Sequence, residues 1–213
     1  MKAYRGAAAQ TYEQKRFRSL KGRAVDFLEW RLLERSLRLL ESSCGRQARS
    51  LLDAPVGTGR MLDRLAAGSR SVIALDASPD MLSLAKARGG AAECVLGRVE
   101  AIPLDDKSLD AVVSVRLFGH LPAEEKAMAL REFARVGRMG AVVFYVGDSK
   151  WLRLRRKRAG KDLPDWHPVS DLLMQAMARE AGLAALGRLR LLGPFAETCA
   201  LVLRTTEAPR ACR

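Results

Sequence analysis

The twelve residues from Leu51 to Leu62 read LLDAPVGTGRML, and this succession of residue types indicates the fold. A short apolar run ends in an acid, Asp53, and the chain then turns through Pro55 and two glycines before a helical pattern begins. Glycine adopts left-handed backbone conformations without steric cost and lets the backbone approach a ligand closely. A glycine turn between a strand and a helix is typical of Rossmann-like, nucleotide-binding sheets.

The sequence on both sides of this turn alternates between strand and helix patterns. Apolar residues recur at helical spacing over residues 23–43, and short apolar runs separated by amphipathic stretches continue to about residue 205. Two final runs, residues 186–193 and 197–205, are typical of a closing antiparallel hairpin. The pattern predicts an α/β fold, namely a Rossmann-like, mostly parallel sheet with helices on both faces.

The composition is that of one globular unit. The chain has 213 residues, of which 48% are hydrophobic and 29% charged, and this length supports a sizeable core. The four cysteines have neither metal-ligand nor redox spacing, so we predict reduced thiols and no metal site. The sequence has no pattern of a secretion signal or a membrane span, which predicts a cytoplasmic protein. We expect an N-terminal helical cap at 1–48, a single compact domain at 49–205 and a tail at 206–213.

The net charge of +13 lies in the two flanks of the chain. Residues 1–49 and residues 150–213 each carry seven more basic than acidic side chains, whereas residues 50–149 carry one more acidic than basic. The stretch 150–161, KWLRLRRKRAGK, is the most basic segment. Basic residues with Trp and Leu suit an anionic membrane surface, and this favours a small or lipid-like, anionic acceptor with possible peripheral membrane contact. RNA remains the alternative partner.

The residues around the glycine turn discriminate between two classes of cofactor. A dinucleotide site has a third glycine where this chain has Leu62, and Asp53 would repel the pyrophosphate of NAD. S-adenosylmethionine has a sulfonium and an ammonium group and no phosphate, so a carboxylate suits it. Asp76 ends the run SVIALD, 23 residues after Asp53, and an acid there binds ribose hydroxyls in either class. The two acids together favour the methyl donor.

The chain resembles the class I S-adenosylmethionine-dependent methyltransferases, and most of all the group that includes ubiquinone/menaquinone-biosynthesis methyltransferases. The resemblance lies in four stretches: LLDAPVGTGRML, VIALDASPDMLSLAK, RVEAIPLDDKSLDAVVSVRLFGHLP and REFARVGR. It implies a seven-stranded sheet whose last strand is antiparallel. It also implies S-adenosylmethionine as the cofactor and an enzyme that transfers a methyl group.

The resemblance further implies which residues hold the donor. The acid and the glycines of the turn hold its methionine part, and the acid that ends the second strand holds the ribose. Residues just after that strand and residues near position 99 enclose the adenine. In chain order these positions are Asp53, Gly57, Gly59, Asp76, Ala77, Met81, Val99 and Glu100. Pro55, which stands where many members of the family have the first glycine of the turn, is a further candidate for the donor site.

Three further residues are candidates with open alternatives. The resemblance places Arg116 against the donor or the substrate. His120, in RLFGHLP, is either a general base for a hydroxyl or enol acceptor or a helix-entry residue hydrogen-bonded to backbone. Tyr12 either contacts the donor carboxylate or is an ordinary surface tyrosine. Two other functions stay open, an RNA-directed methyltransferase and a non-catalytic donor- or anion-binding module of the same fold. An NAD-dependent oxidoreductase is disfavoured by Asp53.

Overall fold

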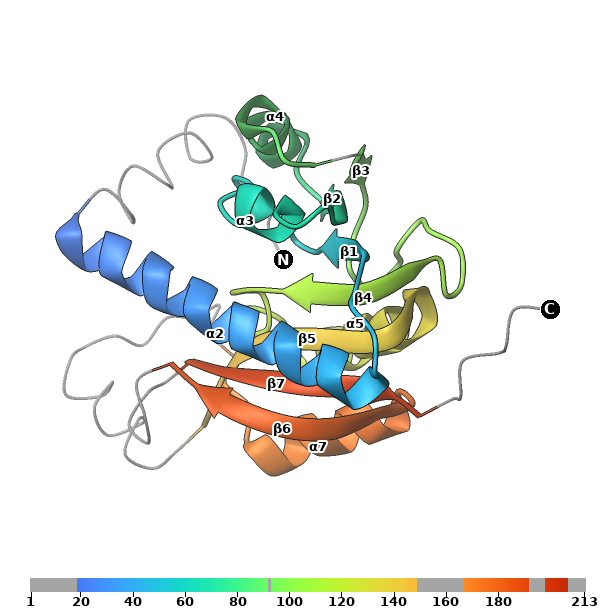
Figure 1. Ribbon diagram of the computed structural model, residues 1–213. Coiled ribbons are helices and arrows are strands. Elements are labelled where there is room, and N and C mark those ends of the chain that lie inside the picture. Colours follow the sequence, from blue (N-terminus) through green and yellow to red (C-terminus); the bar gives the residue numbers. More distant parts are fainter. Residues whose placement is uncertain (1–18, 92, 149–166, 192–197, 207–213) are drawn as a thin grey trace.

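The computed structural model of the protein describes residues 19–91, 93–148, 167–191 and 198–206. Within these residues seven strands form one sheet in the order β3-β2-β1-β4-β5-β7-β6 (Figure 1). All neighbouring strands from β3 to β5 are parallel, and β7 runs antiparallel to both β5 and β6. The predicted fold class and the closing hairpin are therefore confirmed. The strands are β1 Ser50–Asp53, β2 Ser71–Asp76, β3 Glu93–Leu96, β4 Leu109–Ser114, β5 Gly137–Val146, β6 Leu183–Arg190 and β7 Thr198–Thr205.

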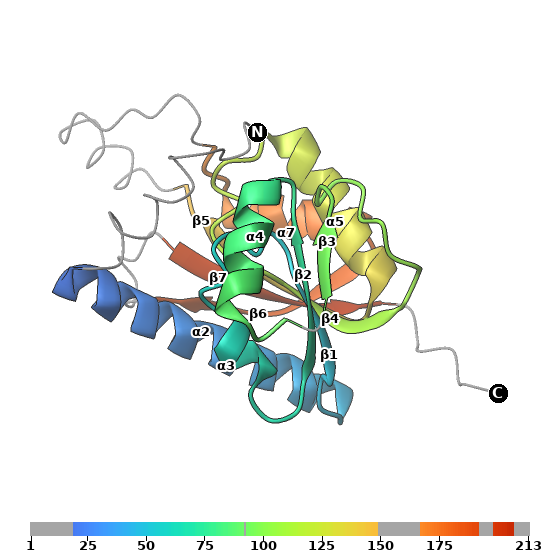
Figure 2. The ribbon, with the colours of Figure 1, turned by 90° about the horizontal axis from the view of Figure 1, so that it is seen from above.

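Helices cover both faces of the sheet (Figure 2). Buried side chains of α2, α3 and α4 form one core with one face, and those of α5 and α7 form a second core with the other. None of the helices in the described ranges combines the length and the apolar composition needed to span a membrane. The helices are α2 Leu20–Cys44, α3 Leu62–Ala66, α4 Pro79–Arg88, α5 Ala123–Val136 and α7 Asp171–Glu180.

Two elements are shorter than the sequence pattern predicts. The stretch TGRMLDRLAAG, residues 58–68, has a helical pattern, but α3 begins only at Leu62, because Gly59 has φ of +75°, which a right-handed helix cannot accommodate. The apolar stretch LDAVVSVRLF, residues 109–118, has a strand pattern, but β4 ends at Ser114, two residues before Arg116, which has φ of +64°. In both places a stretch of irregular backbone lies at the carboxyl edge of the sheet.

The long helix α2 lies against β5 and β7, diagonally across the sheet in Figure 1. The side chains of Leu33 and Leu40 are fully buried in the same core as Phe144 of β5 and Val202 of β7. Apolar residues at helical spacing thus form the face of α2 that packs on the sheet. The helix that precedes the glycine turn in sequence therefore packs on strands that come much later in the chain.

One glycine lets β5 and β7 approach each other closely. Gly140 has φ of +144°, and a Cβ atom there would overlap the carbonyl oxygen of Leu203 and lie 2.9 Å from the Cα atom of Arg204. The pairing of β4 with β5 also shifts register at this level. This point of the sheet has no room for any side chain.

Candidate functional site

A cavity opens at the carboxyl ends of β1, β2 and β4, where parallel sheets of this class bind their ligands. The structure brings ten of the twelve predicted site residues to its lining. Gly59 does not line it, and Tyr12 lies outside the described residues. The ten are Asp53, Pro55, Gly57, Asp76, Ala77, Met81, Val99, Glu100, Arg116 and His120.

The two glycines of the turn have different positions. Gly57 has φ of +55° and lines the cavity, and no atom lies within 4 Å of the point where its Cβ would be. At Gly59 a Cβ would lie 2.9 Å from the Cα atom of Ala85, so its missing side chain lets the turn pack against α4. Gly59 is therefore a packing position, and its contact with the donor stays a prediction.

Asp76 holds the turn in place through its carboxylate. Its Oδ2 accepts a hydrogen bond from the Gly57 amide at 2.9 Å, and its Oδ1 accepts one from the Ser78 amide at 2.9 Å. Burial raises the pKa of Asp76 above its ordinary value, and the amides of Ser78, Gly57 and Ala77 oppose that shift. The acid predicted to bind a ligand thus also fixes the geometry of the glycine turn.

Asp53 is the most deeply buried acid of the cavity, with 3% of its surface exposed. Burial raises its pKa to about 7; the charge of Arg60 lowers the pKa and that of Asp76 raises it. A carboxylate in this environment has little water to stabilise its charge, and a nearby cation stabilises the ionised form. Two buried acids in one cavity therefore suit a cationic ligand.

Sequence reasoning missed Arg60, which also lines the cavity. It stands in the quoted stretch, directly after Gly59, where only a helical pattern was considered. Arg60 and Arg116 both bind Glu29 of α2, with Nη2 of each guanidinium 2.6 Å from a carboxylate oxygen. Glu29 had no signal in the sequence beyond its place in an amphipathic helix.

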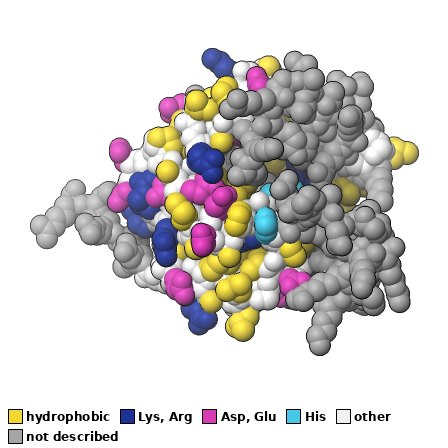
Figure 3. Space-filling view, turned by 180° about the vertical axis from the view of Figure 1, so that it is seen from behind, with side chains coloured by type: hydrophobic (Ala, Val, Ile, Leu, Met, Phe, Trp, Pro, Cys, Tyr) yellow, Lys and Arg dark blue, Asp and Glu magenta, His cyan; other side chains and the backbone are white. Residues whose placement is uncertain are grey.

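His120 lies in a loop that buried Lys126 holds to the segment before α7. The Lys126 ammonium donates to the carbonyl oxygens of Leu121 at 2.5 Å and His167 at 2.7 Å, and burial lowers its pKa to about 8. The His167 amide donates to the Gly119 carbonyl at 2.7 Å. Figure 3 shows the histidine side chains together on one face, among hydrophobic and acidic ones. This loop forms one wall of the cavity.

Residues 52–145 match the family described as a methyltransferase domain. An uncharacterized methyltransferase of Mycobacterium tuberculosis (strain ATCC 25618 / H37Rv) is 36% identical over 130 residues, which are 58% of this chain and 51% of that protein. A malonyl-[acyl-carrier protein] O-methyltransferase of Serratia marcescens is 36% identical over 111 residues, 51% of this chain and 42% of that one. The chain spans about half the length of the curated relatives it matches.

Solved structures of methyltransferases share this fold. The crystal structure of magnesium protoporphyrin IX methyltransferase from Synechocystis PCC 6803 with bound SAH superposes with a TM-score of 0.71 and 13% identity, over 88% of each chain. The predicted fold of the class I methyltransferases is thereby confirmed. The ubiquinone/menaquinone-like subgroup stays a prediction.

Proposed function

We propose that this protein transfers a methyl group from S-adenosylmethionine to a small or lipid-like, anionic acceptor. The observation that carries the proposal is the placement of two buried carboxylates, Asp53 and Asp76, beside the open side of Gly57 in one cavity. This pair of carboxylates fits S-adenosylmethionine, whose ammonium group and sulfonium carry positive charge. The pyrophosphate of a dinucleotide would meet two acids there, which like-charge repulsion disfavours.

The residues of the cavity divide into groups that bind the donor and one that serves the acceptor. Asp53 binds the ammonium group, and Asp76 accepts hydrogen bonds from the ribose through lone pairs that the backbone amides leave available. Met81 and Val99, both nearly buried, enclose the adenine. The bound donor supplies the methyl group, so the chain's task is to orient the acceptor. His120 accepts a proton only where the acceptor must lose one.

The proposal of an anionic acceptor rests on the charge of the flanks. Both flanks are basic while residues 50–149 are nearly neutral, so a negative molecule is attracted to the flanks rather than to the middle of the chain. The basic stretch 150–161 lies outside the described residues. The names of two similar proteins, a malonyl-[acyl-carrier protein] O-methyltransferase and a magnesium protoporphyrin IX methyltransferase, are compatible with such an acceptor. RNA stays the alternative.

Replacing Gly57 by alanine tests the donor site directly. The new methyl group would project into the cavity, and we expect donor binding to weaken by about 1.4 kcal/mol, a factor of ten, or more. Gly68→Ala is the matched control, because Gly68 has φ of +77°, has no atom within 4 Å of its Cβ position and does not line the cavity. Isothermal titration of both variants and the wild type with S-adenosylmethionine and with NADH makes the measurement. Tighter wild-type binding of NADH would contradict the proposal.

Asp76→Ala is expected to weaken donor binding by about 1.5–3 kcal/mol, the range for losing a hydrogen bond to a charged group. It also leaves the amides of Gly57 and Ser78 without their acceptor, so part of any effect is structural. Asp110→Ala is the control for the structural part, because it removes a carboxylate that also accepts from backbone amides. Asp110 accepts from the amides of Arg49 and Ser50 at 2.8 and 3.1 Å, away from the cavity. If both variants bind the donor as the wild type does, the ribose lies elsewhere.

A further inference from the structure

Glu29 joins the long N-terminal helix to two arginines of the donor cavity. Its Oε1 accepts from Nη2 of Arg116 at 2.6 Å, and its Oε2 accepts from Nε of Arg116 at 3.0 Å and from Nη2 of Arg60 at 2.6 Å. The Glu29 side chain is 1% exposed. One buried carboxylate thus makes a two-pronged contact with one guanidinium and a short contact with another.

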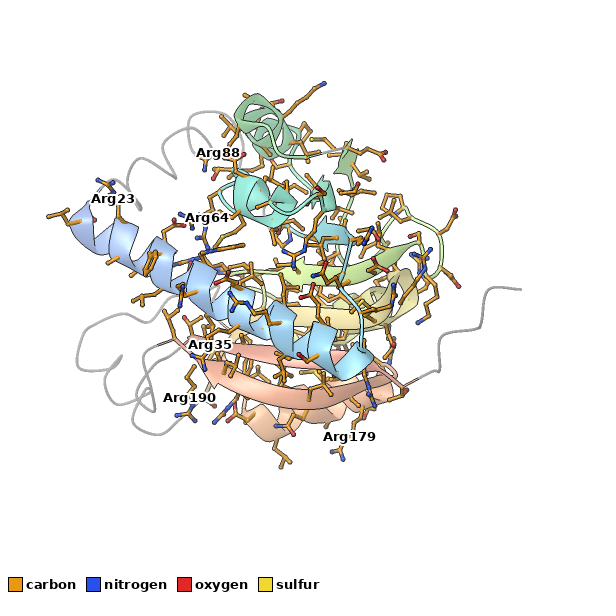
Figure 4. The ribbon with its side chains drawn as sticks, viewed as in Figure 1. Arg23, Arg35, Arg64, Arg88, Arg179 and Arg190 are labelled. Atoms are coloured by element: carbon orange, nitrogen blue, oxygen red, sulfur yellow. The ribbon has the colours of Figure 1, made fainter. Side chains whose placement is uncertain are left out.

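A second acid, one helical turn earlier in α2, extends this arrangement. Asp26 binds Nη1 of Arg60 at 2.5 Å and Nη2 of Arg64 at 3.0 Å. In Figure 4 the side chain of Arg64 lies between α3 and α2. The Asp26 side chain is 20% exposed, so water screens its ion pairs more than those of Glu29. Glu29 is therefore the member of the pair whose charge acts most strongly on the interior.

Both arginines bound by Glu29 line the donor cavity. The backbone of one and the charge of the other make their positions important for the site. Arg116 has φ of +64°, a left-handed conformation that side chains other than Gly, Asn and Asp rarely adopt, so its surroundings must stabilise it. Arg60 stands close enough to Asp53 to lower the pKa of that carboxyl. The two-pronged contact fixes the plane of the Arg116 guanidinium, because only one orientation presents both nitrogens to a carboxylate.

We propose that Glu29 is a positioning residue of the donor site, which orients Arg60 and Arg116 along the cavity and offsets part of their positive charge. The inference rests on the proposed donor site and adds to it a residue from outside the methyltransferase domain match. Glu29 does not line the cavity and acts through the two arginines. Because Glu29 binds both arginines, the Asp53 carboxylate stays available to the cationic end of the donor. Without Glu29 the arginines would compete with the donor for that carboxylate.

The proposal predicts an electrostatic effect in addition to a mechanical one. Neutralising Glu29 leaves more positive charge beside Asp53, so the ionised form of Asp53 is favoured and its pKa falls. The other charged or titratable groups that face Asp53 across the cavity stay the same. They are Arg60, Asp76, Arg98, Glu100, Arg116 and His120.

Glu29→Gln is the test, with Glu41→Gln as the matched control on the same helix. Glu41 accepts from the Ala48 amide and from Nη2 of Arg70, both at 3.0 Å, and does not line the cavity. Each variant removes one charge and weakens one attachment of α2. Carbon-13 NMR of the full-length, donor-free protein measures the titration midpoint of the Asp53 carboxyl, and calorimetry measures the affinity for S-adenosylmethionine.

We expect Glu29→Gln to lower the Asp53 midpoint by about one pH unit and to weaken donor binding about tenfold. Glu41→Gln is expected to leave both values as in the wild type. If the two variants lose stability alike and neither moves the Asp53 midpoint, Glu29 only anchors α2 and the inference is wrong. A wild type that binds no S-adenosylmethionine contradicts the proposed function instead, and the NMR titration still tests the coupling of Glu29 to Asp53.

Discussion

Asp53→Asn is expected to make the donor-free protein more stable at pH 8 while weakening donor binding roughly 10- to 150-fold. The two effects have one cause. A buried carboxylate that is ionised without its ligand destabilises the fold, and the same carboxylate binds the ammonium of the donor. Residues kept for binding at the expense of stability are a recurrent feature of functional sites.

The sign of the stability effect follows from the pKa. Burial raises the pKa of Asp53 from 3.8 to about 7, so between pH 4 and pH 7 the folded protein holds a proton that the unfolded chain has lost. The free energy of unfolding therefore falls as pH rises through that window, by about 4 kcal/mol for a shift of this size. Asparagine does not titrate, so the variant does not lose stability in this way as pH rises. Its buried amide costs about 1–3 kcal/mol at every pH, which leaves a net gain of about 2 kcal/mol at pH 8.

Urea unfolding at pH 4 and pH 8 measures the difference between variant and wild type. Asp110→Asn is the control, for which a change in stability of the opposite sign is expected. Burial raises the pKa of Asp110, but the amides of Arg49 and Ser50 and the charge of Arg46 outweigh burial and hold that pKa below its ordinary value. Its ionised form stabilises the fold, so Asp110→Asn should lose stability at pH 8 and leave donor binding unchanged. An Asp53→Asn variant whose stability relative to the wild type is the same at both pH values would show that Asp53 does not titrate as proposed.

Gly140→Ala is expected to destabilise the fold by at least about 3 kcal/mol, because the added methyl group meets backbone rather than flexible side chains. The Leu203 carbonyl oxygen and the Arg204 Cα atom belong to β7, so the methyl group can be accommodated only if β5 and β7 separate. Those two strands lie side by side over seven paired residues, and separating them disrupts the sheet beneath α2.

Gly45→Ala supplies the comparison for this effect. Gly45 ends α2 with φ of +65°, and no atom lies within 4 Å of its Cβ position, so only backbone strain of about 1 kcal/mol is expected. Far-ultraviolet circular dichroism during urea unfolding compares the two variants with the wild type. Equal losses at both positions would mean that β5 and β7 do not approach as closely as described.

The sequence predicted the parts of the fold that depend on local pattern. The glycine turn, the alternation of strands and helices and the acids that end β1 and β2 all leave a signal within about ten residues, and the predicted site residues gathered at one cavity for that reason. The early end of β4 left no such signal, because Arg116 has a left-handed conformation and its side chain binds Glu29, 87 residues earlier.

The contacts of α2 show the same limit. Its periodicity indicated an apolar face but not which strands that face covers, since the partners Phe144 and Val202 are far away in sequence. Glu29 and Asp26 read as ordinary charges of an amphipathic helix. Only their burial against Arg60 distinguishes them, and burial is a property of the assembled fold. The packing of Gly59 against α4 left no signal either, because the sequence does not say on which side of a turn a helix passes.

The packing of α2 on β7 also affects how the nascent chain folds on the ribosome. The helix ends at Cys44, and its last partner strand begins at Thr198, about 150 residues later. At translation rates of about 5–20 residues per second, β7 is synthesised roughly 8–30 s after the helix. During this interval Leu33 and Leu40 are exposed on a nascent chain, where chaperones bind such surfaces. Ribosome-bound chains truncated before residue 198 should therefore be more sensitive to protease within α2 than chains that include β7.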